Sequence, residues 1–504
     1  MRKLIYFVST VLIAMTFSSC DLDINKDPNY PTDVKADKFF TSGQMFVTGA
    51  IGGDLELIGG MWAQHYAQNA GSNQYTNLDS YNIPNSNTYV TRSWSLLYAG
   101  ALPDLKLAIE KSAIAEDWNY WMASKIMTAY CYHLLVEAYG DVPFTEAVSY
   151  EQFTSPKFDD AKTVNQGIIA MLDEALTKKD AAAAKSSMGN NDFVFGGNIN
   201  NWAKFAKSLK LKILMRDPSF ATNSTAIQAL LTENDLLATD AKVAIFVDKE
   251  NNSNPLFEND RRKLNTTQNI RASSTLSKFL FAKGDPRASV FMEKAVTPDP
   301  VEGSYVGLPQ GGYTLGAAYA NKSSRALIKA EDPVYFMSYA EVEFLKAEAY
   351  VKLTDAASAK TSYDKAVTAA FNRWKDATDL NKQAIFPANF NINDFIGAGK
   401  VYEFNQTSAQ TMLESIWRQK WIAGVRAQAW ESFLEINRTG YPNYGTVNSQ
   451  DASYVVGNLA PSINTVLPAG QFPRRLIYPK TSTDYNKNTP VAVPIQTKLW
   501  WHKQ

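Results

Sequence analysis

The chain has 504 residues, of which 45% are hydrophobic, and its 50 Lys and Arg balance its 50 Asp and Glu. A chain of this length can bury a large core, and the lack of a basic cluster argues against nucleic acid as a partner, because phosphate binding needs an excess of Lys and Arg on one face. Its 25 Tyr, 26 Phe and 11 Trp, with many neutral amides and hydroxyls, suit a surface that stacks on uncharged ligands, although most of these rings are expected in the core.

The N-terminus has the layout of an export signal. A short basic start is followed by an apolar run from Leu4 to Phe17, which is shorter than the roughly 20 apolar residues that a transmembrane helix needs. Two serines then precede Cys20, as in the bacterial lipobox, in which the cysteine thiol is joined to a diacylglycerol. We predict a cleaved lipoprotein signal at 1–19 and lipidation of Cys20. An ordinary signal with an incidental cysteine is the alternative.

An acidic stretch follows the cysteine. Residues 21–28 alternate Asp with other residues like a calcium loop, but the sixth position holds Lys26 instead of Gly and the twelfth holds Thr32 instead of Glu. We therefore interpret 20–40 as an acidic, lipidated tether. No polar linker or break in composition divides the remainder, which predicts a single domain over 41–504.

Apolar residues that recur at three- and four-residue steps predict a mostly α-helical fold. Pro103 should kink the first predicted helix, and Gly140 with Pro143 beyond it should end the second. Cys131 and His133 lie in an apolar part of the second helix, where we expect a small buried thiol and a hydrogen-bonded core histidine. The predicted helices are Trp94–Ile109, Trp118–Tyr139, Val164–Leu176, Asn201–Met215, Tyr339–Lys352, Ala359–Trp374 and Ala409–Asn437.

Small and aromatic residues in two of these helices have the spacing of a tetratricopeptide pair. Glu343 stands where that repeat prefers an aromatic residue, and no uniform 34-residue period runs through the chain, so we predict irregular helical pairs and not a full solenoid. The pattern loosens into Gly-, Pro-, Asn- and Ser-rich stretches over 242–321 and after Tyr441, which predicts a loop-rich half. The residues with tetratricopeptide spacing are Ala347, Tyr350, Ala359, Tyr363 and Ala366.

Sequence signatures of catalysis are absent. No nucleotide-binding or G-x-S-x-G motif occurs, and Gly399-Lys400 lacks its partner glycine because position 394 is Asp. The histidines, at positions 65, 133 and 502, lack metal-ligand spacing. We therefore predict no catalytic residue, metal or cofactor. A surface glycosidase remains the enzyme alternative, because its paired carboxylates are set by spatial separation and not by sequence spacing.

Several blocks, in the same order along the chain, resemble SusD/RagB proteins, in particular the SusD-like subgroup. Lys207, Asn437 and Asp484 depart from the family pattern, which usually has Asn, Arg and Glu there. We interpret the blocks mainly as packing and capping signatures, which identify a fold better than a ligand. The blocks are Tyr139–Ala147, Trp202–Leu209, Tyr339–Glu341 with Ala347–Ala349, Gln419–Ala423, Arg438–Pro442, Pro473–Pro479 and Trp500-Trp501.

This resemblance implies a SusD-like fold, in which irregular tetratricopeptide-like pairs support the loop-rich half, and a nutrient-binding outer-membrane lipoprotein. Such proteins sit as lids on SusC-like TonB-dependent transporters and deliver an oligosaccharide, or in some members a peptide, without cleaving it. A helical-repeat scaffold is a further alternative. The acidic stretch after Cys20 resembles a surface-export tag of Bacteroidetes lipoproteins, so we expect an anchored protein that faces the cell exterior.

Two loop regions are the candidate ligand site. A pyranose presents an apolar face on which rings can stack and a rim of hydroxyls that Asn and Gln can bind. A buried helical stripe is the alternative for Trp62 and Tyr66, which are four residues apart, and Tyr75 and Tyr313 are the main candidates because Asn, Gln and Gly flank them. The candidates are Trp62, His65, Tyr66, Asn69, Asn73, Gln74 and Tyr75 in the first region and Tyr305, Tyr313 and Tyr319 in the second.

Overall fold

Helices make up most of the regular structure in the computed structural model, which describes residues 34–264, 269–300 and 302–503. The predicted signal and Cys20 lie outside the described residues. The longer helices are α2 (Ala36–Gly49), α3 (Leu55–Trp62), α5 (Thr88–Ser95), α6 (Leu102–Ile114), α7 (Trp118–Tyr139), α8 (Ala161–Leu176), α10 (Ile199–Arg216), α11 (Phe220–Glu233), α12 (Ser274–Ala282), α15 (Tyr339–Lys352), α16 (Ala356–Asn372), α18 (Ala409–Ala423) and α19 (Ala429–Thr439).

The remaining elements are short. Two antiparallel two-stranded sheets pair β1 (Tyr66–Gln68) with β3 (Ile270–Ala272), and β2 (Ala241–Val243) with β4 (Val334–Met337). The short helical elements are α4 (Thr76–Asp79), α9 (Lys179–Ala183), α13 (Ala288–Phe291), α14 (Ala317–Lys322), α17 (Asn393–Ile396) and α20 (Lys480–Tyr485), with the π-helical turns η2 (Ala50–Asp54), η3 (Leu96–Ala101) and η5 (Phe257–Lys263) and the 3-10 turns η4 (Gly189–Asn191) and η6 (Gly312–Thr314).

The first two predicted helices are confirmed. Helix α7 has the predicted bounds, and Gly140 follows it with a φ of 81°, a conformation that suits glycine. The helix predicted around Pro103 runs without a break through α5, η3 and α6. Its hydrogen bonds change to a π-helical pattern in η3, just before Pro103, which lies in the first turn of α6. Cys131 and His133 are buried as predicted, but the Nδ1 of His133 has no hydrogen-bond partner among the described residues. Burial raises the pKa of the thiol and lowers that of the imidazole.

The bounds of α8, α10 and α16 differ from the prediction by one to three residues at an end, and two regions differ more. The prediction of one helix over 409–437 is wrong. The structure has two helices there: α18 ends at Ala423 and α19 begins at Ala429. Arg426 between them has a φ of 56°, which a right-handed helix does not allow. At the N-terminus, α2 begins at Ala36 inside the segment predicted as a tether, and Phe40 is fully buried.

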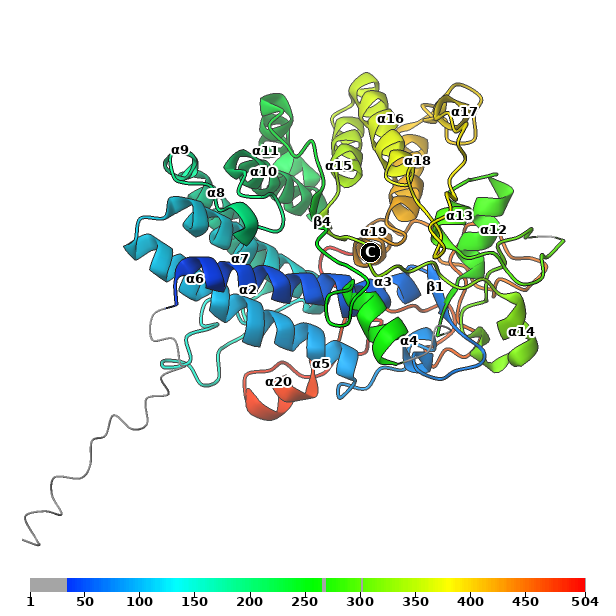
Figure 1. Cartoon of the computed structure of the whole chain (residues 1–504), viewed down its shortest axis with the longest axis horizontal. Helices are drawn as coiled ribbons and strands as arrows, with labels where there is room; N and C mark the ends of the chain where they lie inside the picture. The colour runs from blue at the N-terminus through cyan, green and yellow to red at the C-terminus, as the bar shows by residue number, and fades with distance from the viewer. Residues whose placement is uncertain (1–33, 265–268, 301, 504) are drawn as a thin grey trace, which may run out of the picture.

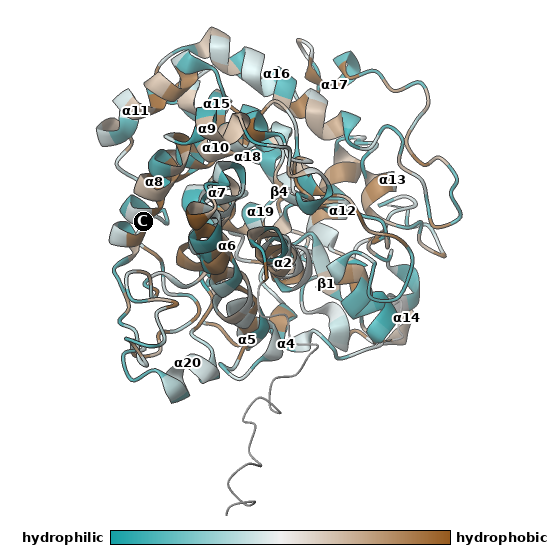
Figure 2. Cartoon of the chain, turned by 60° about the vertical axis from the view of Figure 1, so that its left-hand side comes forward, coloured by the Kyte–Doolittle hydropathy of each residue, from teal (hydrophilic) through white to brown (hydrophobic). Residues whose placement is uncertain are grey.

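The long helices α2, α6, α7, α8 and α10 gather in one half of the molecule, and the other half is richer in loops (Figure 1). α6, α7 and α8 pack side by side, and α15 packs closely against α16, the pair that the spacing of small residues predicted. The loop-rich half holds α12, α13, α14 and the β1–β3 sheet, and α3 and α19 cross near the centre. Hydrophobic residues are concentrated on inner helices such as α2, whereas the peripheral α20 is hydrophilic (Figure 2).

Candidate functional site

The structure brings the two predicted ligand regions into contact through one buried carboxylate. Asp79, in α4, accepts hydrogen bonds from the backbone N–H of Gln68 and Gly311, at 3.1 and 3.0 Å. It also accepts one from the side chain of Gln310, at 3.1 Å. Burial raises the pKa of Asp79 to about 7, and the two backbone hydrogen bonds oppose this increase. The contact between the regions is thus made by core hydrogen bonds and not by the predicted aromatic rings.

Half of the predicted ligand residues belong to the core, which corrects the expectation that they form a surface. The hydroxyl of Tyr75, which is 2% exposed, donates to Asp260 at 2.7 Å. The ring of His65 bonds the carbonyl of Trp421 at 3.1 Å, and the indole N–H of Trp62 donates to the carbonyl of Leu78, also at 3.1 Å. The buried members are Trp62, His65, Tyr66, Asn69 and Tyr75.

The other predicted residues reach the surface. Asn73 and Gln74 are exposed, and the Gln74 amide donates to the Tyr89 hydroxyl at 2.9 Å. Tyr305 and Tyr313 are half-buried, while Tyr319 is 42% exposed. Ligand contact by these five residues stays a prediction, and Tyr319 is the member that lines a cleft.

A cleft of about 480 Å³ opens in the loop-rich half, and we call it the Tyr319 cleft. Its walls come from α12, a loop made by residues 297–300 and 302–309, α14 and the segment around Gln450. The loop lies close to α12 because Gly307 has no side chain: a Cβ there would lie 2.3 Å from the Cα of Ser274. The volume is in the range of small-molecule sites, which is roughly 300–1,000 Å³.

The polar groups of the Tyr319 cleft are of several kinds. The Gln450 amide donates to the Tyr319 hydroxyl at 2.9 Å, so a neutral amide and an aromatic ring lie side by side. Lys278 donates to the carbonyl of Ser449, and Lys322 is exposed at the margin. The sequence prediction included neither Gln450 nor the two lysines. Gln450 could not be found in this way, because no local pattern connects Tyr319 with a residue 131 positions away.

The carboxylates of this cleft hold its own loop. Glu302 accepts hydrogen bonds from the Ser277 hydroxyl at 2.8 Å and from the backbone N–H of Gly307 at 2.9 Å. Burial raises its pKa, and these hydrogen bonds partly offset the increase. Asp299 accepts the backbone N–H of Glu302 at 3.0 Å. Glu302 therefore fixes the loop against α12, and Asp299 stabilises the turn of the loop itself.

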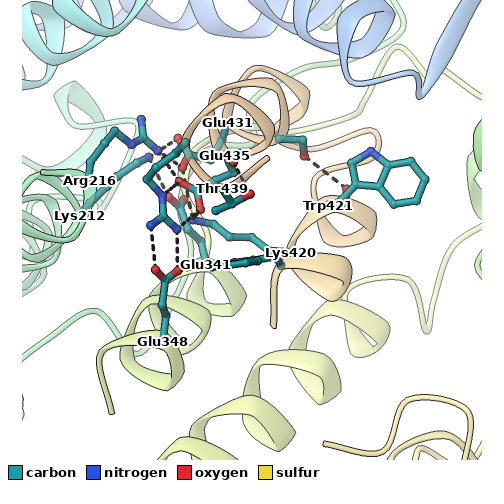
Figure 3. Close-up of polar contacts among 12 residues, drawn as sticks. Lys212, Arg216, Glu341, Glu348, Lys420, Trp421, Glu431, Glu435 and Thr439 are labelled. Carbon is teal, nitrogen blue, oxygen red and sulfur yellow. Dashed lines mark hydrogen bonds and ion pairs between the residues drawn. The ribbon is translucent and has the colours of Figure 1, made fainter. Parts of the chain in front are cut away.

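A second polar centre lies inside the helical half, where buried cations and carboxylates form one ion-pair network (Figure 3). Helix α10 places Arg216 against carboxylates of α7 and α19, while Arg438 of α19 pairs with Glu348 at 2.6 Å and Glu435 at 2.7 Å. Every side chain of the network except that of Lys352 is at most 9% exposed, and cations and carboxylates are equal in number. The members are Lys212, Arg216, Lys352, Lys420, Arg438, Glu137, Glu341, Glu348, Glu431 and Glu435.

Residues from the family-like sequence blocks supply much of this network. Glu341 and Glu348 come from α15, Lys420 from α18 and Arg438 from α19. In another block, the carboxylate of Asp141 accepts the backbone N–H of Ala161 at the start of α8, at 2.9 Å. Asp141 thus has a capping role, as predicted for these blocks, whereas the other four residues form buried ion pairs that the prediction did not include.

A buried carboxyl group at the α3–α19 crossing should make stability depend on pH. The Glu56 carboxylate accepts the N–H of Ala429 at 2.9 Å, and burial, with a smaller effect of Asp332, raises its pKa to about 8. Between about pH 4.5 and 8, Glu56 is ionised in the unfolded chain but keeps its proton in the folded protein. The free energy of unfolding therefore falls as pH rises through this range. One pKa unit is worth about 1.4 kcal/mol. We expect Glu56→Gln to raise the free energy of unfolding by about 2 kcal/mol near pH 8 and to change it little near pH 5.

Urea unfolding of both proteins across this pH range measures the effect. The wild-type free energy of unfolding should fall more steeply with pH than that of Glu56→Gln. Parallel pH profiles would show that Glu56 does not titrate in the folded protein as described.

Within the described residues, no helix is both long and apolar enough to cross a membrane. Over 34–264, 269–300 and 302–503, no group of three or more His, Cys, Asp or Glu side chains is placed to hold a metal ion.

Solved structures of SusD homologues share this fold. One from Bacteroides uniformis ATCC 8492 is 23% identical, with a TM-score of 0.72 over 94% of this chain and 100% of that one. A chitin-binding SusD homologue from Flavobacterium johnsoniae is 19% identical, with a TM-score of 0.70 over 92% of this chain and 98% of that one. Another chitin-binding protein is 22% identical, with a TM-score of 0.70 over 92% and 100%.

The sequence itself also matches a protein family. A search of curated proteins finds no significant match. The model of the SusD-like family described as "Starch-binding associating with outer membrane", however, matches residues 31–479. The chain therefore belongs to this SusD-like family, whose members are associated with the outer membrane.

Proposed function

We propose that the protein captures an oligosaccharide at the cell surface and delivers it, uncleaved, to a SusC-like TonB-dependent outer-membrane transporter. The observation that carries the proposal is the Tyr319 cleft, in which an accessible ring and a neutral amide meet in the loop-rich half. A ring binds the apolar face of a sugar, and an amide both donates to and accepts from its hydroxyls. The family description and two chitin-binding relatives support a carbohydrate as the ligand class.

Two features of the cleft support binding without hydrolysis. A glycosidase needs one carboxyl group that can protonate the leaving oxygen and a second that acts as nucleophile or base. In the Tyr319 cleft, Glu302 is bound by a hydroxyl and a backbone N–H, and Asp299 by another backbone N–H. Both groups already stabilise the loop that forms the wall. We therefore propose that the protein is not an enzyme.

Replacing Tyr319 with Ala should weaken oligosaccharide binding. A ring that stacks on a sugar as a hot spot contributes about 1–3 kcal/mol, which corresponds to roughly 5- to 150-fold in affinity. Thermal stability should change little, because the ring is 42% exposed. Calorimetry with starch- and chitin-derived oligosaccharides measures the difference.

Tyr485→Ala is the matched control for this experiment. Tyr485 is 81% exposed and lies in α20, in a part of the molecule far from α14 (Figure 1). Equal affinities of the Tyr319 and Tyr485 variants would place the binding site outside the Tyr319 cleft.

The lipid anchor and the outward orientation are also part of the proposal. Cys20, preceded by an apolar export signal, is the proposed acylation site, and several acyl chains hold a protein stably at a membrane. We expect Cys20→Ser to abolish palmitate incorporation and to release a folded protein from the membrane fraction. A Cys20→Ser protein that still sediments with membranes would contradict the anchor.

A further inference from the structure

A second cleft, of about 320 Å³, lies beside the first, and we call it the Arg418 cleft. Its walls come from the end of α12, from α18, from the loop that precedes α18 and from the segment around Val456. The side chains that matter for its chemistry are Phe279, Lys283, Asn405, Glu414, Arg418 and Tyr441. Nothing in the sequence marked this cleft, since its residues come from stretches that lie far apart along the chain.

The two clefts share two structural elements. Helix α12 contributes Lys278 to the Tyr319 cleft and Lys283, just past its last turn, to the Arg418 cleft. At about 1.5 Å per residue, these positions are roughly 7–8 Å apart along the helix. The segment 449–457 likewise contributes Gln450 to the first cleft and Val456 to the second. The clefts are therefore neighbours, separated by one segment of chain.

Tyr454 lies between the clefts. Its ring is 5.9 Å from the ammonium of Lys278, and its hydroxyl donates to the carbonyl of Asn458 at 2.6 Å. Burial raises the pKa of Tyr454. Two charged groups also act on this pKa: Arg418 in the Arg418 cleft lowers it, and Glu302 in the Tyr319 cleft raises it. Tyr454 is thus within electrostatic reach of charges in both clefts.

The Arg418 cleft repeats the ring-and-polar chemistry of the first. The guanidinium of Arg418 stacks between the rings of Phe279 and Tyr441, at 4.8 and 4.5 Å from their centroids. It donates to the carbonyl of Gly457 and to the Tyr441 hydroxyl, and it forms no ion pair with any carboxylate in the described part of the chain. A guanidinium has five N–H donors, so this fixed group keeps donors for a ligand.

The other polar groups of the cleft complement this donor. Glu414 accepts a hydrogen bond from Gln410, on its own helix, at 2.9 Å. Asn405 lies in the exposed loop before α18, and its side-chain oxygen accepts from the backbone N–H and the hydroxyl of Thr407, which leaves its amide N–H groups as donors. Guanidinium and amide donors, a carboxylate acceptor and a stacked aromatic pair together suit a neutral ligand that is rich in hydroxyl groups.

We propose that the Arg418 cleft is a second saccharide subsite, so that one oligosaccharide spans both clefts across the segment 449–457. This inference rests on the proposed function and adds a requirement to it: the natural ligand is long. Linking two weak contacts on one chain makes the second contact intramolecular and strengthens binding without any new interaction. Affinity should therefore rise with the number of sugar units.

Calorimetry tests this with maltose and maltohexaose, and with chitobiose and chitohexaose. The hexasaccharide of the series that binds should bind wild-type protein at least about 10-fold more tightly than its disaccharide. Replacing both Lys283 and Glu414 with Ala should remove most of this difference and leave disaccharide binding unchanged, whereas Tyr319→Ala should weaken both ligands. Lys185→Ala, at an exposed position outside both clefts, should match wild type.

The outcomes separate the two proposals. Equal affinity of wild-type protein for both chain lengths, or an unchanged hexasaccharide affinity in the double variant, would overturn the second subsite and leave oligosaccharide capture intact. No binding of any of the four sugars by folded wild-type protein would overturn the proposed function and this inference with it. Circular dichroism of the double variant confirms that it is folded.

Discussion

We expect Gly59→Ala to lower the free energy of unfolding by about 3 kcal/mol or more, because the α3–α19 crossing leaves no room for a side chain. A Cβ at Gly59 would lie 2.3 Å from the backbone N and 2.4 Å from the Cα of Trp430, and 2.5 Å from the carbonyl carbon of Ala429. These are backbone atoms at the start of α19, which cannot rotate away as the end of a flexible side chain can. The helices must separate, and the bond between Ala429 and Glu56 at the same crossing would lengthen.

Gly49→Ala is the matched control for this prediction. The nearest atom to a Cβ at Gly49 is a methyl carbon of Leu96 at 3.9 Å, an ordinary contact. Ala is favoured over Gly in a helix by up to about 1 kcal/mol, so this variant should be as stable as wild type or slightly more stable. Urea unfolding followed by circular dichroism compares the two. Equal stabilities would mean that α3 and α19 do not approach as closely as described.

Arg438→Met should cost about 3–5 kcal/mol, because it removes one of five cations from the buried network, so that its five carboxylates carry a net negative charge away from water. Burial by itself would raise the pKa of Glu348, yet Arg438 and Lys352 hold it at about 2. A carboxyl whose pKa is lowered on folding stabilises the protein above its unfolded pKa of about 4.5, and this contribution is lost as pH falls towards 2. The deficit of the variant should therefore be largest near neutral pH and shrink in acid.

An exposed ion pair gives the control for the network. Lys480 and Asp484 are 2.8 Å apart, with side chains 57% and 42% exposed. Lys480→Met should cost less than about 1 kcal/mol, as is usual for surface pairs. Chemical unfolding at several pH values measures all three proteins. If Arg438→Met and Lys480→Met had the same small effect, the ion-pair network would not be as buried as described.

The sequence could predict elements whose signals are local. The bounds of α7 follow from a continuous apolar run and a glycine at its end, and those of α15 from its helical period. The break between α18 and α19 could not be predicted in this way. It depends on the left-handed backbone of Arg426, whose guanidinium pairs with Asp332, 94 positions away, at 2.6 Å. A long-range contact thus fixes a conformation that the local pattern does not indicate.

In the candidate site, too, local sequence signals could not predict which residues are buried by long-range contacts. Neighbouring Asn and Gln residues suggested that Tyr75 lies on the surface, but Asp260, 185 positions away, binds its hydroxyl in the core. Tyr319 has alanines on both sides in the sequence, yet it does reach a cleft, where its partner is Gln450. Polar neighbours in the sequence indicate a loop; only the fold decides which face of that loop is buried.

Binding without cleavage is the central claim, and one measurement tests it most directly. Purified protein is titrated with the starch- and chitin-derived hexasaccharides in a calorimeter, and the contents of the cell are then separated by chromatography. We predict saturable binding of one of these sugars, which is recovered at its full length. Recovery of shorter sugars would show an enzyme, and the absence of binding to either sugar by folded protein would contradict oligosaccharide capture.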